Sequence, residues 1–152
     1  MKSVYLLVLV SLCQGLPLGA KLSRLLAPNT VEVTVLEPPA IEVSWNKIVS
    51  GDDQDPVLGY KVKLWEVKDV KTTKYAIVDG KVTPVVEEKE EPIDLVSGPS
   101  GLPSEILTSA EETTATYHNI KLDVTYEVRV QAYTKNEEGP MSSPIRIKLD
   151  KD

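Results

Sequence analysis

Apolar and polar residues alternate most clearly between residues 125 and 133. Every second position is apolar and the positions between are polar, as Tyr126, Val128, Val130 and Ala132 alternate with Glu127, Arg129 and Gln131. A period of two is the pattern of a β-strand with one buried face and one solvated face. We therefore predict a strand of a β sandwich whose apolar side lies in the core and whose polar side meets water.

Shorter alternating stretches recur along the chain, at residues 31–35, 41–45, 59–64 and 145–149, and prolines and glycines separate them. None shows the 3.6-residue period of a helix. Short strands at such spacing indicate an all-β sandwich. The side chains that we expect in its core are Trp45, Tyr60, Val62, Tyr117, Ile120, Tyr126, Val128 and Val130.

The region between residues 64 and 115 departs from this pattern. Residues 75–78 and 81–86 flank the dipeptide Asp79-Gly80, which is typical of a two-residue hairpin turn. From Glu87 to Glu112 there are eight acidic residues and one lysine, mixed with Pro, Gly and Ser. Such a composition favours a mobile loop. We predict an edge hairpin followed by an acidic loop, together a long acidic insertion at about residues 68–112.

The N-terminus has the pattern of a secretory signal peptide: a short positive start, Met1-Lys2-Ser3, followed by an apolar run at residues 4–12. This run is shorter than the roughly 20 apolar residues that span a bilayer. Cleavage is expected after Gly15, with a site as late as Ala20 left open. Residues 16–27 then form a linker and residues 28–150 one domain. No later run approaches membrane length, so we expect a secreted, extracellular protein without a membrane anchor.

Cysteine usage and charge narrow the classes of function. The single cysteine, Cys13, lies in the predicted leader, so the mature chain would have neither a disulfide nor a thiol nucleophile. The chain has 17 Lys and Arg against 23 Asp and Glu, a net charge of −6. An acidic chain is a poor partner for nucleic acid or anionic membranes.

Residues that could carry out catalysis are scarce. The only histidine, His118, follows the core candidate Tyr117, so alternation turns it toward solvent. There is no Cys-His pairing, no glycine-rich phosphate loop and no zinc-ligand spacing. We therefore predict a protein that is not an enzyme and has no cofactor.

Two groups of carboxylates are candidates for calcium, which prefers oxygen ligands. The first group lies in a turn-rich loop, where a solvated turn is the alternative. The second is a dense cluster that would hold divalent cations loosely or attract a basic partner, or would only keep a long loop soluble. The groups are Asp52, Asp53 and Asp55, and Glu87, Glu88, Glu90 and Glu91.

Trp65 and Tyr133 are candidates for partner binding. If alternation continues through Leu64 and Ala132, both aromatic side chains face the outside of their sheet. Exposed Trp and Tyr are enriched at binding hot spots. The alternative is that the long insertion folds back over them.

Several stretches resemble the fibronectin type III domain family: PPAIEVSW, GYKVKL, TATYHNI, TYEVRVQAY and GPMSSP. The resemblance covers roughly residues 28–149 except the middle. It implies a seven-stranded, immunoglobulin-like sandwich with Trp45 as the core residue of the second strand. It also implies that the Tyr126 hydroxyl hydrogen-bonds the preceding turn, where Leu122 and Val124 replace the Pro and Thr that the family often has.

The same resemblance implies a function, since members of this family usually serve as adhesion or recognition modules. A leader, one domain and an acidic character are similar in layout to small secreted fibronectin type III proteins of mollusc shells. We expect an extracellular matrix component, of a calcified matrix with loosely bound calcium or mineral. The alternative is a soluble recognition factor, such as a decoy, immune or venom protein, that binds a receptor through a sheet face.

Overall fold

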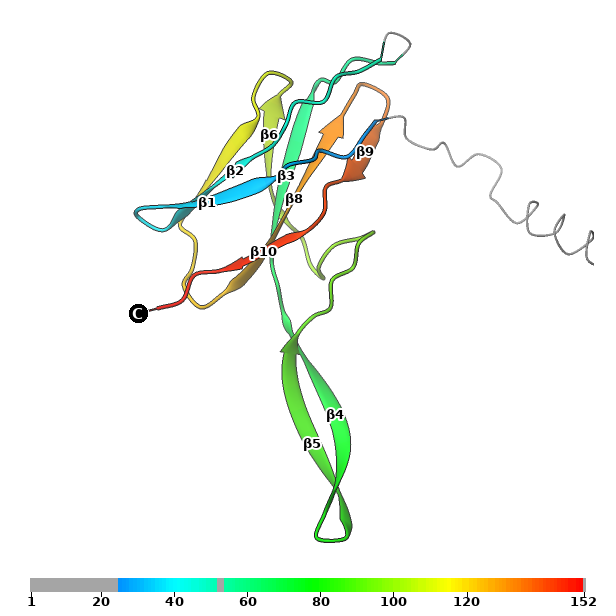
Figure 1. The fold of residues 1–152 in the computed structure, drawn as a ribbon, viewed down its shortest axis with the longest axis vertical. Coiled ribbons are helices and arrows are strands. Elements are labelled where there is room, and N and C mark those ends of the chain that lie inside the picture. Colours follow the sequence, from blue (N-terminus) through cyan, green and yellow to red (C-terminus); the bar gives the residue numbers. More distant parts are fainter. Residues whose placement is uncertain (1–24, 52–53, 152) are drawn as a thin grey trace, which may run out of the picture.

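The computed structural model describes residues 25–51 and 54–151, and its regular structure consists of β-strands alone (Figure 1). The predicted signal peptide and the acids Asp52 and Asp53 lie outside the described residues. Ten strands are present in the described part, three more than predicted. They are β1 (Glu32–Leu36), β2 (Ala40–Ser44), β3 (Gly59–Glu66), β4 (Asp69–Val78), β5 (Lys81–Glu90), β6 (Ser104–Ser109), β7 (Thr114–His118), β8 (Thr125–Tyr133), β9 (Glu138–Met141) and β10 (Ile145–Lys148).

Eight of these strands build two packed sheets. The smaller sheet has the order β1-β2-β7, and the larger has the order β10-β8-β3-β6, with the short β9 paired to β8. All pairings are antiparallel. The longest register within the larger sheet joins β3 to β8, from Gly59 opposite Tyr133 to Glu66 opposite Tyr126. Strand β3 is therefore central in this sheet.

The core lies between the two sheets and contains the apolar side chains that alternate along their strands. Trp45 packs edge-on against Tyr60, with ring centroids 5.3 Å apart and an interplanar angle of 61°. Aromatic pairs favour this geometry, and each ring removes roughly 150–250 Å2 from water. All eight predicted core residues belong to the cluster, which consists of Ile41, Val43, Trp45, Tyr60, Val62, Leu64, Ala115, Tyr117, Ile120, Tyr126, Val128, Val130 and Ala132.

Two tyrosine hydroxyls of this core form hydrogen bonds with backbone groups. The Tyr126 hydroxyl accepts a hydrogen bond from the Lys121 backbone N–H at 3.1 Å and so holds the turn between β7 and β8. The Tyr117 hydroxyl donates to the Val62 carbonyl oxygen at 2.6 Å. Burial raises the pKa of Tyr117, so this hydroxyl stays protonated and remains a donor.

Strands β4 and β5 form a separate hairpin, here called the ribbon (residues 69–90). It projects away from both sheets (Figure 1) and pairs only with itself, from Asp69 opposite Glu90 to Val78 opposite Lys81. Asp79 and Gly80 have φ values of 51° and 74°, as a two-residue hairpin turn requires. The turn was predicted correctly, but the strands extend beyond the predicted residues.

The long acidic loop predicted within residues 68–112 is not confirmed. The region contains the ribbon, a segment folded onto the sandwich, and β6, which pairs with β3 from Gly59 opposite Ser109 to Leu64 opposite Ser104. Glutamates 87, 88 and 90 lie within β5. Their charge did not prevent strand formation, because lysines on the same ribbon pair with two of them.

Candidate functional site

The outer face of the larger sheet is buried, although alternation predicted that it would meet solvent. Glu127 and Arg129 are 0% exposed and Gln131 is 9% exposed. Residues 91–101, here called the covering segment, lie over this face and are anchored to it. Strand β8 is therefore buried on both sides.

Opposite charges compensate one another on this outer face. The Glu127 carboxylate lies 2.6 Å from Arg129 Nη2 and accepts a hydrogen bond from Arg146 Nε at 2.8 Å. One carboxylate thus serves two guanidinium groups. A buried charge without a partner is strongly unfavourable, so the three side chains stabilise the fold only as a set.

The same two arginines hold the covering segment in place through its backbone. Arg129 donates to the carbonyl oxygens of Leu95, at 3.2 Å, and Asp94. Arg146 Nη1 donates to the Glu91 carbonyl oxygen at 2.8 Å. These bonds satisfy backbone carbonyls in a segment that belongs to no sheet.

Trp65 lies beneath the covering segment and is 4% exposed. The Arg129 guanidinium carbon lies 6.0 Å from its ring centroid, within the range of a cation–π contact. A Cβ added to Gly98 would lie 3.0 Å from Trp65 Cζ2, so only glycine allows the backbone to come this close. Of the two alternatives for Trp65, the structure has the one in which the insertion covers it.

Tyr133 is half-buried and does not form an exposed aromatic patch with Trp65. The Lys61 ammonium lies 5.8 Å from the Tyr133 ring centroid and forms an ion pair with Glu138. The hydrogen bond to Glu138 raises the pKa of Lys61. This part of the sheet face is occupied by contacts within the chain.

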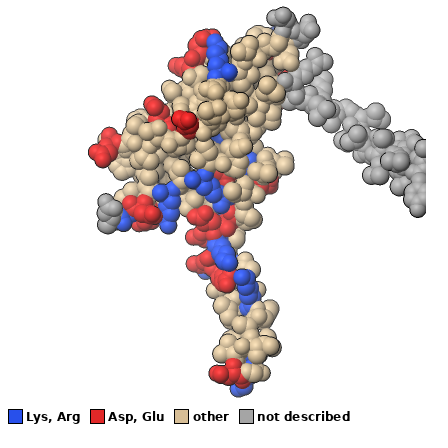
Figure 2. Space-filling model, viewed as in Figure 1, with Lys and Arg blue, Asp and Glu red and all other residues tan. Residues whose placement is uncertain are grey.

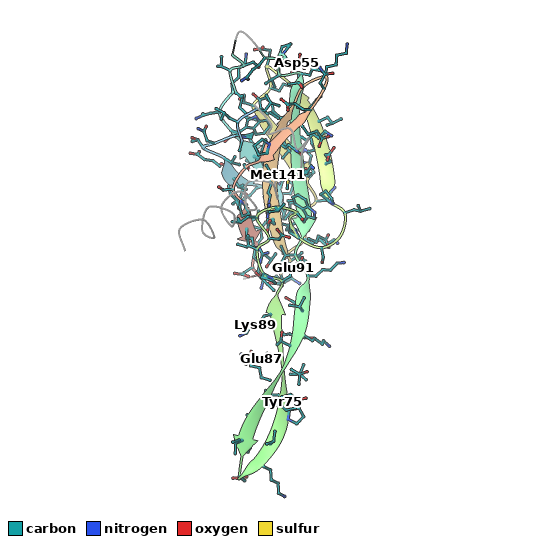
Figure 3. All side chains as sticks on the ribbon, turned by 90° about the vertical axis from the view of Figure 1, so that its right-hand side faces the viewer. Asp55, Tyr75, Glu87, Lys89, Glu91 and Met141 are labelled. Atoms are coloured by element: carbon teal, nitrogen blue, oxygen red, sulfur yellow. The ribbon has the colours of Figure 1, made fainter. Side chains whose placement is uncertain are left out.

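Glu91 connects the ribbon to the covering segment and is 8% exposed. Its carboxylate accepts hydrogen bonds from the backbone N–H groups of Lys68, at 3.3 Å, and Ser100, at 3.0 Å. Burial pushes the pKa of Glu91 upward, but these hydrogen bonds and the charge of Arg146 outweigh it, so the pKa is lowered. Glu91 is a structural carboxylate of this junction (Figure 3).

Three of the four glutamates predicted as a loose cation array are engaged in ion pairs, among them Glu90, which lies 3.6 Å from Arg146. Glu87 lies 2.8 Å from Lys74 and 3.0 Å from Lys89, and hydrogen bonds from these two lysines lower its pKa. Glu88 lies 2.9 Å from Lys71. Figure 3 shows Glu87 and Lys89 side by side on the ribbon. The carboxylates therefore do not form a free acidic surface.

The remaining candidates do not come together in a site. Asp55 is exposed, and its carboxylate accepts a hydrogen bond from the Asn136 side-chain amide. His118 is exposed at the end of β7. Across residues 25–51 and 54–151, no group of three or more His, Cys, Asp or Glu side chains is arranged to hold a metal ion. The same residues include no helix with the length and apolarity to cross a membrane.

An exposed apolar surface that was not predicted lies on the ribbon. Residues directly opposite in an antiparallel pair point to the same side. The register places Tyr75 opposite Pro84, Ile77 opposite Val82 and Thr73 opposite Val86. We call the five apolar members the apolar ribbon face: Tyr75, Ile77, Val82, Pro84 and Val86.

The apolar ribbon face is open to solvent. The exposed fractions are 73% for Tyr75, 78% for Ile77, 69% for Val82 and 61% for Val86. Charged side chains lie at the base and at the tip of the ribbon, with an uncharged stretch between them (Figure 2). The alternation of Tyr75, Ile77, Val82, Pro84 and Val86 about Asp79-Gly80 was the signal from which this face could have been found.

Comparison with known proteins identifies the fold and the family. Residues 26–148 match the fibronectin type III domain. Contactin of Drosophila melanogaster is 26% identical over 117 residues, which are 77% of this chain and 6% of that protein. The chain thus spans a small fraction of this relative.

Two solved structures share the architecture. The solution structures of the fn3 domain of human contactin 1 superpose with a TM-score of 0.56 at 18% identity, covering 91% of this chain and 90% of that one. The crystal structure of the chicken CNTN1 FN1-FN3 domains gives a TM-score of 0.54 at 21% identity, covering 83% and 32%. At these identities the likeness concerns the fold. Together with the match over residues 26–148, it shows that the chain belongs to the fibronectin type III domain family.

Proposed function

We propose that the protein is a non-enzymatic extracellular binding protein, a component of an extracellular matrix, that contacts a protein partner through the apolar ribbon face. The observation that carries this proposal is the exposure of that face, with Tyr75 at 73% and Ile77 at 78%. Five such side chains make a patch on the order of 500 Å2, a size that often marks a functional surface on a monomer.

The energetics of the ribbon support a role in contact. An isolated two-stranded hairpin is at best marginally stable in water. Here no residue of the ribbon is buried, Glu90 at its base contacts Thr125 and Arg146, and within the described part of the chain its strands pair only with each other. A partner that covers the apolar face would remove it from water and stabilise the hairpin at the same time.

The extracellular setting rests on the predicted leader and on membership in a family whose members usually act in adhesion and recognition. The alternative, a soluble recognition factor that binds through a sheet face, has less support. Its proposed anchor, Trp65, is 4% exposed and lies under the covering segment.

Association with a mineral is a separate part of this proposal. Calcium would have to displace Lys74 and Lys89 from Glu87, and Lys71 from Glu88. Calcium titration of the wild type and of a variant with Glu→Gln changes at positions 87, 88, 90 and 91 tests this. Equal binding by the two proteins, or no binding at millimolar calcium, would remove the calcified-matrix part and leave the binding function.

The binding function is tested by retention of proteins from the secreted material of the source tissue on the immobilised protein, measured by quantitative mass spectrometry. The wild type is compared with the double variant Ile77→Ser/Val82→Ser, whose two sites lie opposite each other. Val78→Ser, on the other side of the ribbon, is the matched control. We expect specific retention by the wild type and the control only. Equal retention by all three proteins would overturn the proposal.

A further inference from the structure

We propose that the apolar ribbon face binds the same face of a second copy of this chain, with the two ribbons antiparallel and related by a twofold axis. This inference rests on the proposed function and deepens it by naming the partner. It follows from three properties of the face: its internal symmetry, the charges at its two ends and its area.

The face is arranged symmetrically about its centre. Tyr75 and Pro84 form the middle pair. Ile77 and Val82 lie on the side of the tip, and Thr73 and Val86 lie toward the base. A twofold axis that crosses the ribbon at the middle pair places the tip pair of one copy over the base pair of the other. Val82 then meets Val86 of the second copy, and Ile77 meets Thr73, whose side chain is polar but uncharged. No charged side chain of the face intervenes between the two pairs.

The charges at the ends of the face are complementary in this orientation. Such an axis places β4 over β4 of the second copy, running in the opposite direction. Lys71 at the base of one ribbon therefore lies over Asp79 at the tip of the other. Glu88 lies over Gly80 of the second copy, and Lys81 points to the other side of the ribbon together with Val78. Both signs are visible at the base and at the tip of the ribbon (Figure 2). The contact between opposite charges occurs twice, as an isologous interface requires.

The antiparallel orientation also keeps the two sandwiches apart. Ten residues per strand give a ribbon on the order of 33 Å long. The ribbon projects from one end of the sandwich, as Figures 1 and 3 show. With the ribbons reversed, each sandwich lies at the far end of the ribbon pair. A parallel orientation would bring both sandwiches to the same end, where they would compete for the same space.

The area predicts a weak but specific dimer. Two patches on the order of 500 Å2 each would bury on the order of 1,000 Å2 in total, at the lower end of specific interfaces. Interfaces of this size are typical of weak, transient complexes. Self-association of this strength depends on the local concentration of the protein, which is high in a matrix and low in dilute solution.

Sedimentation equilibrium of the full chain from about 1 μM to about 1 mM tests the dimer. The wild type and Val78→Ser should change from monomer to dimer across this range. Ile77→Ser/Val82→Ser should weaken association by at least about tenfold. Tryptophan fluorescence confirms that the sandwich is intact in each variant, because both tryptophans lie outside the ribbon. A wild type that stays monomeric at the highest concentration, or a double variant that associates normally, would overturn the inference.

The orientation is tested by chemical cross-linking at the twofold axis. Tyr75→Cys in a Cys13→Ser background places one thiol of each copy beside the axis, within reach of a short bismaleimide. Val78→Cys places the thiol on the opposite side of the ribbon. We expect covalent dimers for position 75 and monomers for position 78. Equal cross-linking at both positions would contradict the face-to-face arrangement.

Failure of this inference and failure of the proposed function are distinguishable. A monomeric protein that still retains partners through Ile77 and Val82 would reject self-association and preserve binding. A dimer that retains no other protein would restrict binding to self-assembly.

Discussion

Strand β8 and the ribbon both have alternating polar and apolar residues, but they differ in whether the two faces are buried. Both contain long antiparallel strands in which polar and apolar residues alternate. In β8 the apolar face meets the core and the polar face meets the covering segment, so both are buried. In the ribbon neither face is covered by residues 25–51 or 54–151. The difference is that other segments cover both faces of β8 but not those of the ribbon. Strand β8 therefore contributes to stability, whereas the ribbon is accessible to a partner.

The ion pairs of the two regions differ in the same way. Glu127 and Arg129 form a pair with 0% exposed side chains, whereas Lys71 and Glu88 on the ribbon are 72% and 57% exposed. Loss of one partner from a buried pair leaves an uncompensated charge in a medium that solvates it poorly. An exposed charge is solvated by water with or without its partner. Removal of one partner from an ion pair is therefore costly in the sandwich and nearly neutral on the ribbon.

Glu127→Ala should have the largest effect. It leaves Arg129 and Arg146 without the carboxylate that they share, and the free energy of unfolding should fall by about 3–5 kcal/mol. Urea denaturation followed by tryptophan fluorescence measures this change. Glu105→Ala, in β6 of the same sheet, is the control and should change stability by less than about 0.5 kcal/mol. A loss below about 1 kcal/mol for Glu127→Ala would contradict the stabilising role of the network.

Gly98→Ala should have an intermediate effect. Gly98 has a φ of 82°, and a Cβ there would press on Trp65, so we expect a loss of about 1–3 kcal/mol. Gly101→Ala is matched, because Gly101 has a φ of 97° but its nearest contact is the flexible Lys68 side chain, at 3.6 Å. The difference in stability between the two variants isolates the contact with Trp65.

Trp65 also provides a spectroscopic readout of this pair of variants. Only Gly98→Ala should shift the tryptophan emission to longer wavelength, since only this change lifts the covering segment from the ring. Identical emission spectra for the two variants would mean that the segment is not held against Trp65.

The pH dependence of stability should show a smaller effect, through Glu91. Its folded pKa lies below the ordinary value of 4.5, so the folded state binds fewer protons than the unfolded state. The stabilisation is complete above pH 4.5 and is lost as the pH falls through the folded pKa. Unfolding free energies measured from pH 7 to pH 3 should therefore decrease less steeply in Glu91→Gln than in the wild type. Parallel profiles would show that Glu91 is not a source of acid sensitivity.

Ile77→Ser should have the smallest effect on stability, because Ile77 is 78% exposed and contributes nothing to the core. We expect a change within about 0.5 kcal/mol at protein concentrations where the chain is monomeric. Thermal or urea denaturation of dilute samples measures it. A loss comparable to that of Glu127→Ala would mean that the ribbon and the sandwich unfold as one unit.

The core between the two sheets could be predicted from the sequence, because the alternation of apolar residues indicates directly which side chains are buried. Trp45, Tyr60 and Tyr126 were placed in the core on this basis, and all three lie there. The corner at Tyr126 followed from a family resemblance and is present as a hydrogen bond to Lys121.

The outer half could not be predicted in this way. Glu127 and Arg129 were expected to meet solvent, because polarity along a strand does not reveal whether a distant segment covers it. The covering segment has no period, and its attachment depends on hydrogen bonds from Arg129 and Arg146 to its backbone, which no side-chain pattern encodes. Trp65 at an outward position was the one sequence feature that indicated a cover, since a large aromatic side chain on a solvated face is unfavourable unless another segment covers it.

The regular pairing of the ribbon determines how its length can change. All ten residue pairs are in register without a bulge. Insertion or deletion of two residues in each strand would lengthen or shorten the ribbon and keep its hydrophobic side facing the same way. A change of one residue per strand would turn the distal part over. Even changes in strand length thus alter only the length of the ribbon, and odd changes alter the side to which its apolar face points. Neither requires a change in the sandwich.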